Sequence, residues 1–447
     1  MLADDSLALL ADLIAKAKTA GADAADAVLV DGTALSVAYR LGHPEKVERS
    51  EGGDLGLRVF VGKRQAIVSS SDRGNLALDE LVERAIAMAR TVPEDPFCGL
   101  AEPHQLATQL PQLDICDADE PAPGWLVDWA KRAEDSARAV PGVTNSEGAA
   151  AAWGRTSVSM AASNGFATSY SMSSSQISVS VLAGDAAGGM ERDYDYATAV
   201  YAGDLPLPEE VGRAAGHRAV RRLHARKVKT ARVPVVYDPR VSSSLLGHLA
   251  AAINGSTIAR GTSFLKDCLG KPVFAAGVNI IDDPHRPRGL RSKPCDGEGV
   301  ANRRRQIVED GVLTTWILDL RSARQLGLET TGHAARGTGG PPSPSATNLW
   351  LDGGPVTVAE LISDISQGLY VTELFGMGVN GVTGDYSRGA AGFWIDGGEI
   401  AFPVHEVTIA GNLKDMFRNL TAANDLVFRY GIDAPTVRID GLTIAGA

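Results

Sequence analysis

The sequence has few cysteines and no apolar run long enough to cross a membrane. Its four cysteines lie far apart, at positions 98, 116, 268 and 295, and form no Cys-x-x-Cys pair. This spacing excludes a disulfide framework and a zinc-finger type of site. No stretch approaches the roughly 18 apolar residues that a membrane-spanning helix needs, and the first residues carry two acids where a secretory signal would carry lysines. We therefore expect a cytoplasmic protein with reduced thiols and no membrane partner.

Positive charge is also scarce. The chain has 43 lysines and arginines against 54 aspartates and glutamates, which gives a formal net charge of −11. Binding to nucleic acid depends on clustered cations that contact phosphates, so we expect no nucleic-acid partner. The densest basic run, residues 218–232, lies at the end of a predicted helix, where cations are favoured. We interpret it as a solvated helix end that leads into a linker.

The length of 447 residues exceeds one ordinary core, so we predict two domains, 1–228 and 229–447. In the first, apolar residues recur at helical spacing over 7–20 and 76–90, and alternate as in strands over 28–61. Asn164-Gly165 predicts a tight hairpin, because both residues accept positive φ. This domain should be α/β, with antiparallel strands and covering helices.

The second domain should be mainly antiparallel β, which makes the fold class α+β. It opens with a strand, and Asp238-Pro239 then predicts a helix start, with an N-cap followed by proline at the first helical position. Asn254-Gly255 predicts the end of that helix. Short strands and turns dominate the remainder, and only modest helices are expected near 360–366 and 413–420.

The helix that follows Asp238 carries His248, which raises the possibility of a metal site. A helical zinc site needs two histidines on one face and a glutamate that activates water. The neighbours of His248 at one turn are serine, leucine and alanine, so we interpret it as a structural or interface histidine. Two other groups offer ligands but are interpreted as a capped turn and as residues on opposite faces of a strand: Asp282-Asp283 with His285, and His405-Glu406.

Nucleophilic catalysis has weak support in the sequence. There is no Gly-x-Ser-x-Gly elbow. Cys268 or Cys295 could meet a histidine in space, so a self-sufficient cysteine hydrolase stays open as an alternative.

Two glycine-rich tracts, residues 336–348 and 376–387, combine glycines with small hydroxyl and amide residues. Such tracts let another backbone come close, and an exposed strand edge there could bind a peptide by strand addition. Tight turns in a β domain would explain the same composition.

Several segments resemble the TldD/TldE (PmbA) family along nearly the whole chain. They are Ser163-Asn-Gly165, Arg192-Asp-Tyr194, Arg260-Gly-Thr-Ser-Phe264, Glu309-Asp-Gly-Val-Leu313, Ser322-Ala-Arg-Gln-Leu-Gly-Leu328, residues 336–349, Val382-Thr-Gly-Asp-Tyr386, Ile409-Ala-Gly-Asn412 and residues 437–446.

This resemblance implies a cytosolic two-subunit metallopeptidase. Its TldD subunit carries His-Glu-x-x-x-His on a helix and a cysteine ligand near the C-terminus, and its TldE subunit lacks them. With Arg260-Gly-Thr-Ser263 as the anchor, the motif positions fall on Leu246, Gly247 and Ala251, and no cysteine follows Cys295. The chain therefore resembles the TldE (PmbA) type, with no catalytic residues or cofactor of its own and with zinc expected in a TldD-like partner.

The resemblance further implies a heterodimer that acts on unfolded peptides or peptide precursors, with a homodimer possible for the isolated chain. Glycine content and the family pattern together suggest a set of peptide-contacting residues: Thr262, Ser263, Gly378, Asn380, Gly384 and Asp385. The alternative is a regulatory binding protein without a role in proteolysis, in keeping with the family's older name, modulator of DNA gyrase.

Overall fold

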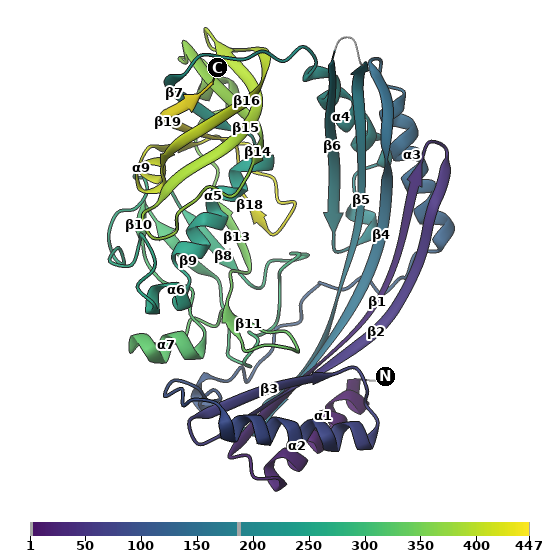
Figure 1. The fold of residues 1–447 in the computed structure, drawn as a ribbon, viewed down its shortest axis with the longest axis vertical. Helices are drawn as coiled ribbons and strands as arrows, with labels where there is room; N and C mark the ends of the chain where they lie inside the picture. The colour runs from purple at the N-terminus through teal and green to yellow at the C-terminus, as the bar shows by residue number, and fades with distance from the viewer. Residues whose placement is uncertain (1–2, 186–188, 447) are drawn as a thin grey trace.

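A long curved sheet faces a body of smaller sheets in this α+β protein (Figure 1). The structure is a computed structural model that describes residues 3–185 and 189–446. Within these residues the first sheet has six strands in the order β3-β2-β1-β4-β5-β6, all antiparallel. They are β1 (Ala24–Arg40), β2 (His43–Val61), β3 (Arg64–Ser70), β4 (Val143–Ala162), β5 (Ala167–Asp185) and β6 (Gly189–Ala199).

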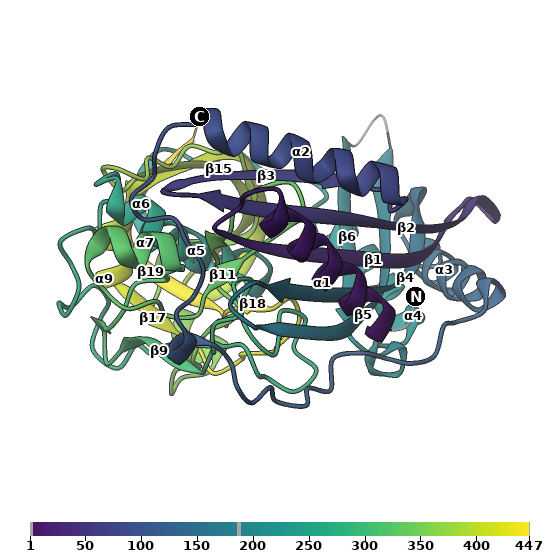
Figure 2. The ribbon, with the colours of Figure 1, turned by 90° about the horizontal axis from the view of Figure 1, so that it is seen from below.

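Two pairs of helices cover separate parts of this sheet. Helices α1 (Ala3–Thr19) and α2 (Asn75–Thr91) share one core with β1, β2 and β3, and they lie over the strands when the molecule is seen from below (Figure 2). Helices α3 (Pro123–Arg138) and α4 (Pro208–Arg221) share a second core with β4 and β5. The helices predicted from the 3.6-residue period are thus confirmed, as is the hairpin at Asn164-Gly165.

The two faces of β1 differ in composition because side chains alternate along a strand. Ala25, Ala27 and Leu29 face the core under α1 and α2. The intervening positions point toward the C-terminal half, where Val28 packs against the chain near residue 295. Asp26 belongs to this second face and is nevertheless buried.

The C-terminal half contains two larger sheets and a two-stranded ladder. The first larger sheet has the order β16-β15-β14-β7-β19-β17, and an extra β16–β19 pairing closes five of its strands on themselves. The second has the order β10-β9-β8-β13-β18, and β11 pairs with β12. The strands are β7 (Ala231–Tyr237), β8 (Ile280–Asp283), β9 (Arg305–Glu309), β10 (Val312–Leu313), β11 (Ala334–Ala335), β12 (Ser343–Pro344), β13 (Asn348–Leu351), β14 (Gln367–Phe375), β15 (Asp385–Asp396), β16 (Glu399–Asn412), β17 (Leu420–Ala422), β18 (Ile432–Asp433) and β19 (Val437–Ala445).

Most of these pairings are antiparallel, with parallel ladders at β7–β14 and β13–β18, so the predicted fold class is confirmed. Short helices accompany the sheets: α5 (Pro239–Ala252), α6 (Gly255–Ala259), α7 (Leu320–Leu326), α8 (Val358–Ile362) and α9 (Leu413–Arg418), with single 3₁₀ turns η1 (Pro103–Gln105) and η2 (Ala202–Asp204) in the first half. No helix in the described residues is long and apolar enough to cross a membrane.

Three local features differ from the prediction. Helix α5 ends at Ala252, just before Asn254-Gly255 as predicted, but Asn254 does not cap it: its side chain accepts a hydrogen bond from the backbone N–H of Ser256 and thereby starts α6. Helix α7 was not predicted, although Asp319 and Ser322 form a capping box at its start. The basic run lies at the end of α4 as predicted, and Arg221, Arg226, Lys227 and Lys229 are exposed, but the Arg222 side chain is 12% exposed and pairs with acidic residues of β6 and β14.

Candidate functional site

Helix α5 occupies the place where the family resemblance puts a metal site. Its start follows the predicted pattern, since the Asp238 carboxylate accepts a hydrogen bond from the backbone N–H of Arg240 at 3.0 Å and Pro239 fills the first helical position. Leu245, Leu246 and Leu249 point into the C-terminal core. The helix is therefore anchored along its apolar side and continuous through the motif positions.

The three motif positions cannot hold a metal ion. Leu246 is 2% exposed and belongs to the apolar core. Gly247 has no side chain, and a Cβ placed there would meet no atom within 4 Å. Ala251 is exposed and presents only a methyl group. None of these groups carries a ligating atom, and no cluster of three His, Cys, Asp or Glu side chains suited to a metal was found among the residues that the structure describes.

His248 is the titratable residue of α5, and its ring is largely buried. It lies edge-on to Tyr386, with ring centroids 6.0 Å apart. Its Nε2 atom has no hydrogen-bond partner within the described part of the chain. Burial lowers the pKa of His248, and the nearby charge of Arg388 lowers it further. The imidazole is accordingly neutral at physiological pH.

The segment that leaves α5 and the second glycine-rich tract lie side by side. The Phe264 N–H donates to the Gly381 carbonyl at 3.0 Å, and a Cβ on Gly384 would lie 3.4 Å from the Phe264 ring. Ser263 is buried and its hydroxyl donates to the Ala252 carbonyl at 2.5 Å, whereas Thr262 is exposed. The structure thus brings together residues that the sequence separates by more than a hundred positions.

The tract itself is a folded turn. Asn380 Oδ1 accepts the backbone N–H of Val382 at 2.9 Å, and Asp385 accepts a hydrogen bond from the Thr383 hydroxyl at 2.6 Å. The Gly378 carbonyl accepts the Ser387 N–H at 2.6 Å. Gly378, Asn380 and Asp385 are exposed, while Gly384 is buried. Of the six predicted peptide-contacting residues, Thr262 and these three exposed residues face solvent.

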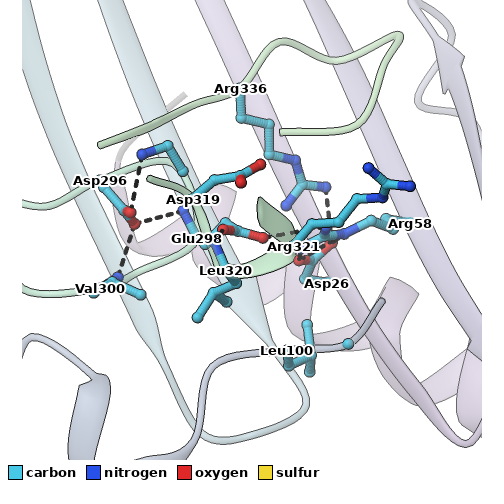
Figure 3. A network of polar contacts seen from close by, with 12 residues as sticks. Asp26, Arg58, Leu100, Asp296, Glu298, Val300, Asp319, Leu320, Arg321 and Arg336 are labelled. Carbon is cyan, nitrogen blue, oxygen red and sulfur yellow. Dashed lines mark hydrogen bonds and ion pairs between the residues drawn. The ribbon is translucent and has the colours of Figure 1, made fainter. Parts of the chain in front are cut away.

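The first glycine-rich tract lies elsewhere, against the first sheet (Figure 3). Arg336, at its start, has Nη2 2.8 Å from Oδ1 of Asp26 on β1, and its side chain is 3% exposed. Arg58 on β2 stands directly opposite Asp26 in the strand register, and its Nε donates to the same carboxylate at 3.1 Å. Glu298 Oε1 lies 3.5 Å from Arg58 Nη1. We call Asp26, Arg58, Glu298 and Arg336 the buried ion cluster.

The electrostatics of this cluster follow from burial and pairing. Burial alone would raise the pKa of Asp26, but Arg336 and Arg58 outweigh it and hold that pKa below its usual value. Burial raises the pKa of Glu298 to about 7, against the favourable charge of Arg58. Glu298 also accepts the Leu320 N–H at 2.9 Å, at the start of α7. The cluster therefore ties the first sheet to α7 and contains one carboxyl group that titrates near neutrality.

A cavity of about 700 Å³ adjoins the buried ion cluster. We call it the joint cavity, because one wall is the first sheet and the other is the chain around 293–297 and 334–338. Sequence reasoning missed both features. The available signal was Asp26 within the apolar stretch AADAVLV, where a charge at a strand position needs a partner.

The cysteine alternative finds little support in the geometry. Cys295 is fully buried among Val28, Met160 and Phe166. Burial raises the pKa of its thiol to about 12, so the thiolate needed for attack is scarce at neutral pH. Cys268 packs against the C-terminal core.

The other candidate metal ligands do not lie together. Asp282 is buried with His333 and Thr347, while His285 pairs with Asn302.

Comparison with known proteins identifies relatives over the whole chain. Sequence profiles of the PmbA/TldA metallopeptidase family match three consecutive segments: domain 1 at 25–89, the central domain at 116–223 and the C-terminal domain at 230–446. Metalloprotease PmbA of Escherichia coli O157:H7 is 39% identical over 426 residues, which cover 95% of this chain and 92% of that protein. A Haemophilus influenzae protein named as a homologue of PmbA is 37% identical over 436 residues, covering 96% and 94%.

Solved structures agree with this assignment. A crystal structure from Bacteroides thetaiotaomicron, described as a candidate modulator of DNA gyrase, aligns with a TM-score of 0.91 over 100% of both chains at 25% identity. TldE from Thermococcus kodakarensis aligns with a TM-score of 0.86 over 98% of this chain and 100% of that one, at 20% identity. The second likeness shows a shared fold.

Proposed function

The chain belongs to the PmbA/TldA metallopeptidase family, and from that premise we propose that it is the non-catalytic, TldE/PmbA-type subunit of a heteromeric zinc peptidase. Its partner is a TldD-like subunit that carries His-Glu-x-x-x-His, and its substrates are unfolded peptides or peptide precursors. The four cysteines of the chain are unpaired, in keeping with a cytoplasmic location.

One observation carries the proposal. Helix α5 keeps its caps, its core packing and the Arg-Gly-Thr-Ser segment that follows it, but the three motif positions hold leucine, glycine and alanine. Zinc in a peptidase lowers the pKa of bound water, and a glutamate takes the proton. Neither a metal ligand nor this base stands at the three motif positions of α5. The chemistry is therefore assigned to a partner.

The role left to this chain is to shape the substrate path. The exposed part of the second glycine-rich tract carries Met377, which is 92% exposed, and Val382, which is 57% exposed. Beside them stand Thr262, Asn380 and Asp385. An extended peptide that meets this surface would find exposed apolar side chains beside polar ones. We assign peptide or partner contact to this surface, with Ser263 and Gly384 holding its backbone in place.

The test is reconstitution with a His-Glu-x-x-x-His homologue from the same organism. Peptidase activity on an unfolded substrate is measured for each chain alone and for the mixture, and complex formation is followed by size-exclusion chromatography with light scattering. We expect a stable heteromer, activity in the mixture only, and no stoichiometric zinc in this chain alone. Tightly bound zinc in the isolated chain, or equal activity of the partner without it, would overturn the proposal.

A second function has support from one comparison, because a protein with the same fold is described as a candidate modulator of DNA gyrase. A regulatory binding protein of that kind would need no partner peptidase. The reconstitution separates the two: a chain that forms no complex with the homologue, leaves its activity unchanged and alters gyrase supercoiling would belong to the second class.

A further inference from the structure

We propose that the joint cavity binds an organic carboxylate with an apolar body, holding the carboxylate at Arg336 and Lys293 and the body against the first sheet. A peptide C-terminus that ends in apolar residues and a free aliphatic acid share this chemistry. The site lies apart from α5 and from the second glycine-rich tract.

The apolar side of the cavity comes from the even-numbered positions of three neighbouring strands. Because side chains alternate, these positions share the face turned toward the C-terminal half. They are Val28 and Val30 of β1, Val158 and Met160 of β4, and Tyr170 and Met172 of β5. A volume of about 700 Å³ lies within the range of roughly 300–1,000 Å³ typical of small-molecule sites.

The opposite wall supplies two cationic side chains. Arg336 is 3% exposed, and its Nε has no hydrogen-bond partner in the described chain. Its Nη2 lies 2.8 Å from Asp26 Oδ1, but outside hydrogen-bond geometry. Lys293 donates one hydrogen bond, to the Ala334 carbonyl at 2.8 Å, and an ammonium group has three such donors. Both side chains are therefore left with unused donors.

Arg336 leaves room for an anion at this end of the cavity, whereas Lys293 already lies near two buried carboxyl groups, Asp296 and Asp282. Arg58 and Arg336 share the single carboxylate of Asp26, and Arg58 also meets Glu298. The carboxylate in the cavity lining, Asp54, accepts a hydrogen bond from the Thr338 hydroxyl. Asp54 disfavours an anion at the Thr338 end, which places the ligand's acid group with Arg336 and Lys293. A planar carboxylate matches the guanidinium fork.

Glycines form part of the cavity lining, and two of them have open space beside them. Gly32, Gly52, Gly53 and Gly337 all belong to the lining, and a Cβ on Gly337 or Gly52 would meet no atom within 4 Å. The body of a longer ligand can therefore extend past these positions, as a peptide chain would need.

The experiment is isothermal titration calorimetry on the full chain with matched pairs of probes. Octanoate is compared with octan-1-ol, and an N-acetylated peptide that ends in Leu-Leu is compared as free acid and as amide. We expect the acids to bind at least tenfold more tightly than their neutral partners. If only the peptide acid binds, the ligand is a chain end, and if only octanoate binds, it is a free aliphatic acid. Either result supports the proposal. Equal binding of acid and neutral probes, binding of inorganic phosphate in place of both acids, or no binding of either acid would overturn it.

Two variants locate the site. Arg336→Met keeps an unbranched apolar stem but removes the guanidinium group and should weaken acid binding at least tenfold, whereas Arg303→Met, at an exposed arginine of the same half, should leave it unchanged. Val158→Trp fills the apolar side and keeps both cations, so it should abolish binding even if Arg336→Met proves poorly folded. Undiminished binding in Val158→Trp would place the ligand elsewhere and refute the assignment.

Discussion

The motif positions of helix α5 and the buried ion cluster differ in the kind of side chain that they contain. Helix α5 holds Leu246, Gly247 and Ala251 at the positions where the family resemblance places metal ligands and a base. The buried ion cluster has four ionisable side chains that are 3–5% exposed, and no sequence motif predicted it. The buried ion cluster thus places four ionisable groups where the two halves meet, whereas the three motif positions of α5 hold none.

This difference in side chains indicates that the buried ion cluster joins the two halves, which the motif positions of α5 do not do. Buried charges persist only when they are paired, because desolvation otherwise costs several kcal/mol per ion. Asp26, Arg58 and Arg336 meet this condition across two parts of the chain far apart in sequence. The three motif positions of α5 have no such demand and hold apolar side chains or none.

Asp26→Ala should give the largest loss of stability. It leaves two buried guanidinium groups without the carboxylate that they share, and breaking a buried pair costs about 3–5 kcal/mol. The free energy of unfolding is measured by urea titration followed by circular dichroism. Ala251→Ser, on the exposed side of α5, serves as the control and should stay within about 0.5 kcal/mol of wild type. A loss below about 1 kcal/mol for Asp26→Ala would mean that the cluster does not hold the halves together.

Gly56→Ala should disturb the same contact through packing. A Cβ at Gly56 would lie 2.3 Å from the Thr338 carbonyl oxygen, which is backbone and cannot rotate away. We expect a loss of about 3 kcal/mol, the upper end of what overpacking costs. Gly337→Ala changes the facing loop at a position with open space and should be nearly neutral. Equal stabilities of the two variants in the same urea titration would contradict the close approach.

Part of this contrast was predictable and part was not. The helical periods of α1 and α2, the Asn164-Gly165 hairpin and the start of α5 rest on neighbouring residues, and each was predicted correctly. The pairing of Asp26 with Arg58 depends on the register between two strands of 17 and 19 residues. Composition alone does not fix that register.

The joint cavity was harder still to foresee. Its walls come from β1, β2, β4, β5 and the chain around 293–338, and only the folded arrangement brings Arg336 to Asp26. The role of Asn254 at the end of α5 was also predicted incorrectly, because asparagine suits both a helix end and the N-cap of the next helix. Local sequence signals thus predicted individual helices and turns, whereas the cluster and the cavity depend on contacts between residues far apart in the sequence.

Glu298→Gln should change how stability depends on pH. The pKa of Glu298 is about 7 in the folded protein, raised by burial from 4.5, so the folded state keeps a proton that the unfolded state has lost. The stability from this group is complete below about pH 4.5 and is lost as the pH rises through 7. Its size is on the order of 3 kcal/mol.

The measurement is the free energy of unfolding of both proteins at several pH values from 4 to 8. Glutamine cannot titrate, so the stability of the variant should fall less than that of wild type as the pH rises. Burial also raises the pKa of Asp296, which contributes to the pH dependence of both proteins. Parallel curves for wild type and variant would show that Glu298 does not carry the proton.

Gly247→Ala should give the smallest effect, and a gain. Glycine inside a helix is less favourable than alanine by about 0.5–1 kcal/mol, and a Cβ here would meet no atom within 4 Å. The thermal midpoint should therefore rise slightly, with reconstituted peptidase activity unchanged. A loss of stability would show that the space beside Gly247 is not open, and a loss of activity at unchanged stability would show that the partner or peptide uses that space. In either case α5 would have a role beyond core packing, and the functional difference between α5 and the buried ion cluster would be smaller than we propose.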